Sequence, residues 1–273
     1  MARPFGAHWS SDFWLAMISL AFGTPVIASM AVAHEKWCLS GTYTAIGAHP
    51  WAAAGWVGGW AWAYWLVSIP VYLLIWDAWF YVLHLVLHTE PVYRWSHANH
   101  HAFKPPVAWS GIAIDPVEQL FSGIFPYMLP LFTPVWVGGA WSLLPFHLYT
   151  VYAINVLLVA WALFLHSSST WEGNWLMMGP VFHNLHHAEG IRNGNYGAIF
   201  KVYDRLFGTL RLHEDGSAVK ASWAAAEEAA AAKAAGKAGG GKAAAAAATT
   251  TPKAGGSVAR PRRASVAGGK KAA

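Results

Sequence analysis

The stretch from residue 84 to residue 101 reads HLVLHTEPVYRWSHANHH. It holds an H-x-x-x-H pair followed by an H-x-x-H-H motif, and residues 183–187 repeat that motif as HNLHH. Residues three and four positions apart share one face of a helix, and neutral imidazole is the commonest metal ligand in proteins. We therefore interpret these clusters as a metal site. Its eight candidate ligands are His84, His88, His97, His100, His101, His183, His186 and His187.

The number of clustered histidines indicates two metal ions rather than one. A single histidine on an apolar helix is usually a core residue with a partner, but burying eight imidazoles without partners would cost on the order of several kcal/mol. Eight ligands also exceed the first shell of one ion. All-imidazole sites suit Fe, Zn, Cu or Ni, and the Glu-x-x-His motif of soluble di-iron bundles is absent from the sequence. The pattern favours a di-iron centre that activates O2, with hydrolysis by a metal-bound hydroxide as the competing chemistry.

Other polar residues near the clusters are candidates for supporting roles. His166 ends an apolar stretch 17 residues before His183, and we favour it as a ninth ligand over a residue that only caps a helix. His147 lies within the same stretch and is expected to face the bundle interior. Asp77 shares a helical stripe with His84, where a carboxylate would accept the outer N–H of a ligating histidine; an ion pair with an arginine is equally consistent. Weaker candidates for outer contacts are Asn184, Glu189 and Asn195.

The composition predicts a protein that lies mostly in a membrane. Hydrophobic residues make up 56% of the 273 residues and charged residues 11%, whereas a water-soluble domain carries about 25% charged residues. Four apolar stretches approach the ~20 residues that a membrane-spanning helix needs. They cover residues 13–33, 51–76 (continuing to His88), about 117–140 and 141–165. Prolines interrupt the last two stretches, so a full hairpin and a re-entrant one both remain open.

Two such hairpins would return the chain twice to one membrane face. The histidine clusters follow the second and fourth stretches, so all three are expected on that face. The predicted fold class is an all-α integral membrane protein, a four-helix transmembrane bundle with a cytosolic, histidine-rich di-metal cap. We expect an N-terminal transmembrane region (residues 1–69), a catalytic domain (residues 70–216) and a disordered basic tail (residues 217–273).

The positive net charge of the chain belongs to this tail. Residues 1–216 carry 8 Lys and Arg against 11 Asp and Glu, and the other 10 Lys and Arg lie in residues 217–273. Trp223 is the only aromatic residue of the tail, so the basic and aromatic surface typical of nucleic-acid binding is missing. The final Lys270-Lys271-Ala272-Ala273 matches a dilysine signal for retrieval to the endoplasmic reticulum. Cys38 is the only cysteine, which excludes an intramolecular disulfide.

Taken together, the motifs resemble the fatty acid hydroxylase/sterol desaturase superfamily, over about residues 70–212. The stretches that carry the resemblance are 77–88 (DAWFYVLHLVLH), 93–101 (YRWSHANHH), 182–187 (FHNLHH), 195–197 (NYG) and 204–209 (DRLFGT). The arrangement is most similar to members of the sterol C-5 desaturase type. Asp115 and Thr170 stand where many such desaturases have histidine.

The resemblance implies a membrane oxygenase of the endoplasmic reticulum, with two Fe ions bound by the histidines. Such an enzyme takes O2 and electrons from NAD(P)H, delivered by cytochrome b5 or a similar donor, which here is expected to be a separate protein. Its substrate would be a lipid, a sterol or a fatty acyl chain, that is hydroxylated or desaturated. The histidine clusters and the tail would be cytosolic. The alternatives from other classes are a metal-dependent membrane hydrolase and a non-catalytic membrane scaffold.

Overall fold

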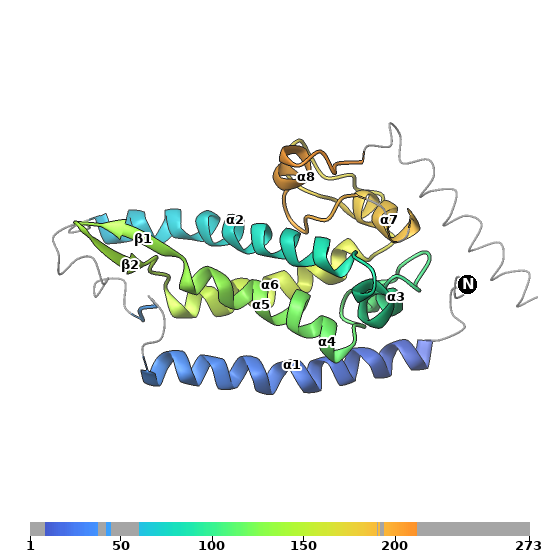
Figure 1. Cartoon of the computed structure of the whole chain (residues 1–273), viewed down its shortest axis with the longest axis horizontal. Helices are drawn as coiled ribbons and strands as arrows, with labels where there is room; N and C mark the ends of the chain where they lie inside the picture. The colour runs from blue at the N-terminus through green and yellow to red at the C-terminus, as the bar shows by residue number, and fades with distance from the viewer. Residues whose placement is uncertain (1–8, 38–41, 45–59, 190, 192–193, 212–273) are drawn as a thin grey trace, which may run out of the picture. The chain divides into compact units, whose positions relative to one another are not determined.

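The computed structural model describes residues 9–37, 42–44, 60–189, 191 and 194–211. Three long helices run lengthwise through this part of the chain (Figure 1); they are α1 (Trp9–Trp37), α2 (Ala61–Leu87) and α6 (Leu148–Leu165). The shorter elements are η3 (Tyr93–His97), α3 (Ala98–His100), η4 (Ala108–Gly111), α4 (Pro116–Glu118), η5 (Gln119–Ile124), α5 (Phe125–Met128), η6 (Leu129–Phe132), β1 (Pro134–Val137), β2 (Ala140–Leu143), α7 (Pro180–Glu189) and α8 (Val202–Leu206). The predicted tail lies outside the described residues.

Helices α2 and α6 run in the same direction, side by side. Near their N-terminal ends, the Tyr64 hydroxyl donates to the Pro145 carbonyl (2.8 Å), and the Trp65 indole N–H donates to the Thr150 hydroxyl (2.9 Å). At their C-terminal ends, both helices reach the histidine clusters, α6 with His166 as its C-cap. The chain between them therefore has to return from the histidine end to the other end.

The segment that returns from the histidine end differs from the long third helix that the sequence predicts. Residues 116–132 form α4, η5, α5 and η6 in succession, and the β1–β2 hairpin follows. Pro126, Pro130 and Pro134 each lack the backbone N–H that a helix needs, and three of them within nine residues disfavour a continuous helix, although α1 and α2 each continue through a single proline. Gly138 and Gly139 turn the hairpin with positive φ angles of 61° and 85°, which glycine adopts without strain.

The predicted four-helix bundle is therefore not confirmed, and the described part of the chain is mostly helical with one small antiparallel sheet. Among the described residues, α2 and α6 are long and apolar enough to cross a membrane, and Phe13–Val26 within α1 is a shorter apolar segment. The irregular segment between α2 and α6 packs against α1 and α2. Irregular backbone is tolerated at membrane depth where it is buried in protein in this way.

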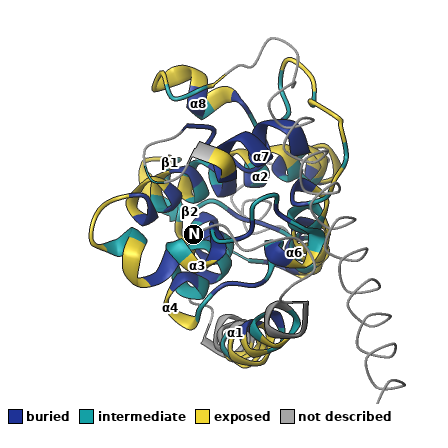
Figure 2. Ribbon diagram, turned by 90° about the vertical axis from the view of Figure 1, so that its right-hand side faces the viewer, coloured by how far each residue is buried: buried dark blue, intermediate teal, exposed yellow. Residues whose placement is uncertain are grey.

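The main core joins α2, α6 and the irregular segment, and the dark ribbon in the interior of Figure 2 marks these buried residues. Tyr72 on α2 is fully buried, and its hydroxyl donates to the Tyr127 carbonyl at 2.9 Å. Other large apolar side chains of the two helices are exposed, such as Trp62 on α2 and Leu157 on α6, which are 64% and 67% exposed. Exposed apolar faces on long helices fit contact with lipid.

Candidate metal centre

The structure brings all nine predicted histidines together at one end of α2 and α6. His84 lies in the last turn of α2, and His88 follows the end of this helix. The second cluster lies on η3, on α3 and just after it, and the third lies on α7. Each of the nine side chains is buried, with at most 6% of its surface exposed. Segments as far apart in the sequence as His84 and His187 therefore meet at one site.

The nine histidines form two groups, and within each group the candidate ligand atoms lie within 4.8 Å of one another. The five-histidine group consists of His84, His88, His97, His101 and His186. The four-histidine group consists of His100, His166, His183 and His187. His166 thus joins a group as a ninth member, as the sequence suggested, although its role as a ligand stays a prediction.

Each H-x-x-H-H motif contributes to both groups. The first and last histidines of the second cluster, His97 and His101, join the five-histidine group, whereas His100 joins the other. The third cluster is divided in the opposite sense: its first and last histidines, His183 and His187, join the four-histidine group, whereas His186 joins the five-histidine group. A helix turns about 100° per residue, so positions one and five are about 40° apart, whereas position four is about 60° from position one on the other side and about 100° from position five. The spacing of the motif therefore lets one short helix hold two neighbouring sites.

Outer hydrogen bonds fix the orientation of four rings. The Nδ1 atoms of His84, His88, His166 and His186 face the carbonyl oxygens of Tyr196 (2.8 Å), Ile191 (3.2 Å), Ala162 (2.7 Å) and Gly194 (2.8 Å), respectively. A carbonyl oxygen only accepts, so each of these Nδ1 atoms carries the ring proton. The Nε2 atom of the same ring is then the unprotonated nitrogen, as a metal ligand requires.

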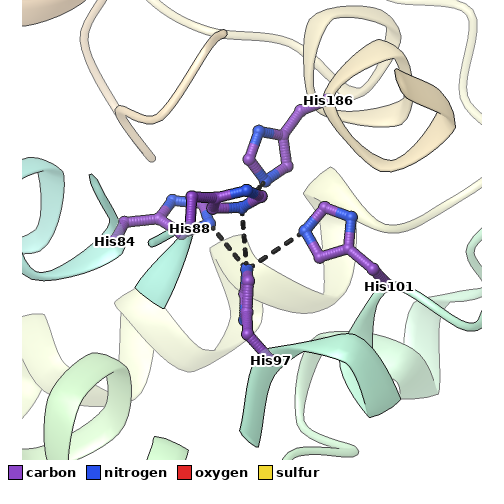
Figure 3. A group of neighbouring side chains, drawn as sticks. All are labelled: His84, His88, His97, His101 and His186. Atoms are coloured by element: carbon purple, nitrogen blue, oxygen red, sulfur yellow. Dashed lines mark hydrogen bonds between the residues drawn. The ribbon is translucent and has the colours of Figure 1, made fainter. Parts of the chain in front are cut away.

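These bare nitrogens face one another, as Figure 3 shows for the five-histidine group. Nε2 of His88 lies 3.2 Å from Nε2 of His186, although neither atom carries a proton. Burial lowers the pKa of His88 to about 3 and the pKa of His186 well below its ordinary value. At neutral pH a proton therefore does not separate the two lone pairs, whereas a metal cation would.

The spacing of the nitrogens also suits metal ions. Nε2 of His97 lies 3.0 Å from that of His88 and 3.1 Å from that of His101. In the other group, Nε2 of His166 lies 2.9 Å from that of His183 and 3.1 Å from that of His187. Two nitrogens bound to one ion at about 2.1 Å and at a right angle to each other are about 3.0 Å apart. The residues present therefore fit two transition-metal ions.

Glu118 is a buried carboxylate at this site that sequence reasoning missed. Its Oε1 atom lies 2.8 Å from Nδ1 of His97, and both side chains are at most 2% exposed. Asp115 fixes the start of α4, because its Oδ1 atom accepts from the backbone N–H groups of Val117 and Glu118. A carboxylate behind a ligating histidine orients the ring and strengthens it as a donor. The available signal was an acidic residue at the start of a long uncharged stretch, just after an Asp-Pro helix start.

Asp77 is buried near the site, but its partners differ from both predicted ones. Its Oδ1 atom accepts from the backbone N–H groups of Ala198 and Ile199, both at 2.9 Å, and Oδ2 accepts from Phe200 N–H at 3.0 Å. These bonds replace the predicted contact with a histidine or an arginine, because a loop without secondary structure leaves its N–H groups in need of acceptors. Asp77 therefore anchors the loop whose Tyr196 carbonyl orients His84.

The remaining candidates lie outside the two groups. His147 caps the start of α6, where its side chain accepts from Thr150 N–H. The Asn184 amide donates to the Ser167 carbonyl (3.3 Å), and the Asn195 amide donates to the Phe182 carbonyl (3.2 Å). The side chain of Glu189 lies outside the described residues, and Thr170 is exposed.

A cavity of about 220 Å³ reaches both histidine groups. Among the residues at its histidine end are His84 and His97 of one group and His100, His166 and His183 of the other. Its walls come from α1, α2, η5 and α6, and most of them are apolar. The larger wall residues include Leu20, Trp76, Phe80, Tyr127, Leu158 and Trp161. The geometry thus combines a candidate di-metal centre with an apolar compartment beside it.

Comparison with known families identifies the chain. Residues 69–209, just over half of its 273 residues, match the fatty acid hydroxylase family. The chain belongs to this family. The superfamily resemblance that the histidine motifs indicate is thereby confirmed, and the match includes all nine histidines of the two groups.

Curated relatives of this fatty acid hydroxylase family member act on sterols, by their names. A Delta(7)-sterol 5(6)-desaturase of Candida dubliniensis is 28% identical over 155 residues, which are 57% of this chain and 37% of the relative. One of Gibberella zeae is 28% identical over 151 residues, 54% of this chain and 38% of the relative. A methylsterol monooxygenase of Aspergillus fumigatus is 27% identical over 151 residues, 53% of this chain and 48% of the relative. The chain thus matches less than half of the length of each. No solved structure matches it significantly.

Proposed function

We propose that this protein is a membrane-bound oxidoreductase that hydroxylates or desaturates a lipid, using O2 and two iron ions held by the two histidine groups. The observation that carries the proposal is the apolar cavity that ends on bare imidazole nitrogens of both groups. An apolar compartment suits a substrate with no reactive polar group. The family membership and the sterol oxidoreductases among the relatives support the same reaction class.

In this proposal the nine histidines hold the ions, and the protein around them fixes the rings. Bound iron would supply O2 activation and the removal of hydrogen from an unactivated C–H bond. The carbonyls of Tyr196 and Gly194 orient His84 and His186 in the five-histidine group. Glu118 does so for His97 in the same group. These outer contacts keep the Nε2 lone pairs directed inward before an ion arrives, which reduces the cost of reorganisation on binding.

The cavity walls would bind the lipid and exclude water from the reacting carbon. Trp76 and Phe80 stack at 5.2 Å between ring centroids and form a flat apolar wall on α2, about two turns and one turn before His84, respectively. The cavity is smaller than the about 300–1,000 Å³ of pockets that enclose a whole drug-sized ligand. We infer that it holds part of a lipid, with the rest among the helices or in the bilayer. Hydroxylation and desaturation begin with the same hydrogen removal, and both stay open.

We further propose that α2 and α6 cross the membrane of the endoplasmic reticulum with their histidine ends on the cytosolic face. Both helices carry histidines at their C-terminal ends, which supports one common face. Electrons would come from NAD(P)H through cytochrome b5 or a similar donor on that face. Residues 70–216 would form the catalytic domain, residues 1–69 an N-terminal transmembrane region and residues 217–273 a basic tail.

The proposal is tested by metal analysis of the purified protein together with an oxygen-consumption assay on lipid substrates. We expect about two iron ions per chain and a product that forms only with O2 and a reductant. Zinc together with turnover in the absence of O2 would instead indicate the metal-dependent hydrolase. Intact metal binding with no turnover of any lipid would favour the scaffold. His166→Ala serves as the negative control, because it leaves only three histidines in the four-histidine group.

A further inference from the structure

One polar contact crosses the apolar cavity wall between α1 and η5. The Ser19 hydroxyl on α1 donates to Oε1 of Gln119, the first residue of η5, at 2.7 Å. Both residues line the cavity, and Ser19 is only 2% exposed. Segments with a π-helical turn are frequent at functional sites. Because Ser19 holds the oxygen end of the amide, the Nε2 end of Gln119 is the end that remains for another partner.

Two glycines make the space in which this amide lies. A Cβ atom added at Gly23 on α1 would be 2.7 Å from Nε2 of Gln119, and one added at Gly123 on η5 would be 2.4 Å from the same atom. Glycine is unfavourable within a helix, yet a side chain at either position would push the amide away. Both glycines also line the cavity. The amide is therefore given a defined place in the wall.

Nε2 of Gln119 has no hydrogen-bond partner within the part of the chain that the structure describes. The hydroxyl of Ser122, another polar group of the lining, donates to the Glu118 carbonyl (3.1 Å), and no hydrogen bond joins it to the Gln119 amide within the described residues. An amide donor in apolar surroundings is costly unless an acceptor reaches it. The lining includes no Lys or Arg among the described residues, so no cationic side chain accompanies the amide there. A neutral oxygen is the acceptor that the site suits.

We propose that Gln119, oriented by Ser19, forms a subsite that binds the hydroxyl group of the lipid substrate. The hydroxyl oxygen accepts a hydrogen bond from Gln119 Nε2, while the apolar skeleton occupies the wall toward Trp76 and Phe80. This rests on the proposed function and narrows it: the substrate is a lipid alcohol, such as a sterol, and not a free fatty acid. Ser19 lies outside the matched residues 69–209, so the subsite joins the family domain to α1.

The test is a binding measurement on the purified full chain in detergent or in nanodiscs. Tryptophan fluorescence reports the binding of cholesterol and of cholestene, its analogue without the hydroxyl, since Trp76 and Trp161 line the cavity. We expect the unmodified protein to bind cholesterol about five- to tenfold more tightly, as one neutral hydrogen bond allows. Gln119→Leu should bind both lipids equally while keeping its affinity for cholestene. Ser19→Ala and Gly23→Ala should lower the preference to intermediate values, because each frees or displaces the amide.

The matched control is Ser68→Ala, which removes a serine hydroxyl that bonds only within α2, to the Trp65 carbonyl. It should keep the full preference for cholesterol. An equal loss of affinity for both lipids in Gln119→Leu would show that the amide is only structural and would overturn the proposal. So would equal binding of the two lipids by the unmodified protein. Palmitate that binds more tightly than cholesterol would also refute it.

These outcomes are distinct from failure of the proposed function. The binding measurement needs neither O2 nor turnover. A protein that binds cholesterol more tightly than cholestene but oxidises neither lipid would support the proposed subsite and contradict the proposed oxidoreductase function. A protein that oxidises a fatty acid and binds cholesterol and cholestene equally would support the oxidoreductase function and contradict the proposed subsite.

Discussion

The two histidine groups differ in how firmly the protein holds their rings. In the five-histidine group, four Nδ1 atoms have an outer acceptor: three carbonyls and the Glu118 carboxylate. In the four-histidine group, His166 has such a bond, whereas the buried Nδ1 atoms of His183 and His187 have no partner among the described residues. The backbone of Ser110 lies close to His100 but not in hydrogen-bonding geometry.

The groups also differ in their access to the cavity. Three of the four histidines in the smaller group line the cavity, against two of the five in the larger group. A group with fewer ligands, looser rings and more contact with the cavity is better placed to offer an ion an open position. The five-histidine group is the more rigid partner. We therefore expect the two ions to differ in affinity and in exchange rate.

The largest expected effect comes from removing one ring from each group. His166→Ala leaves three histidines in the smaller group, whereas His101→Ala leaves four in the larger one. Outer partners of ligands are worth about 10–100-fold, so the loss of His166 itself should lower oxygen-dependent product formation more than about 100-fold. Metal analysis after exposure to a weak chelator should give about one ion per chain for His166→Ala and about two for His101→Ala, since four ligands suffice to hold an ion.

The control for this pair is His147→Ala, which removes a partly buried histidine that caps the start of α6 and lies outside both groups. It should keep both ions. Equal metal loss in the two ligand variants would show that the groups are equivalent, and the comparison between them would fail.

The next effect concerns the loop that supports the larger group. Asp77→Asn places an amide NH₂ opposite a backbone N–H donor of residues 198–200, so one buried donor loses its acceptor. The free energy of unfolding should fall by about 1–3 kcal/mol, measured by thermal denaturation of the metal-loaded protein in detergent. Because the same loop carries the Tyr196 carbonyl that orients His84, metal release from the five-histidine group should accelerate. Faster release from the four-histidine group alone would contradict this link.

The sequence identified the nine histidines as candidate ligands. It did not predict how they divide into two groups or how the two groups differ. Their spacing reveals which rings share a helix face, because helical geometry is local. It does not reveal which ring from one motif meets which ring from another, because this depends on packing between distant segments. His186 joins His84 and not its neighbour His187, and only the arrangement of α2 against α7 decides that.

The supporting residues show the same limit. Asp77 was recognised as important, but its actual partners are three N–H groups more than 120 residues away in the sequence. Glu118 was missed because a carboxylate near prolines and apolar residues carries no periodic signal of its own. The third apolar stretch was expected as a helix from its hydrophobicity, and three prolines proved stronger than that tendency. The sequence therefore indicated which residues are chemically important, but not which distant residues they contact in the folded protein.

The last effect, of similar size for the leucine variant and smaller for the glutamine variant, tests whether the Glu118 side chain behind His97 helps to hold the rings of the larger group in place. Glu118→Leu removes the acceptor of Nδ1 and should weaken metal binding in that group about 10–100-fold, as for other outer partners of ligating histidines. Glu118→Gln keeps a neutral oxygen that accepts the same N–H, so its loss should stay near tenfold or below. Competition with a chelator of known affinity measures both variants, and the four-histidine group of the same protein serves as the internal reference. If the glutamine and leucine variants lost the same affinity, the carboxylate would act by its charge alone. If neither lost any, the larger group would owe its rigidity to the three backbone carbonyls.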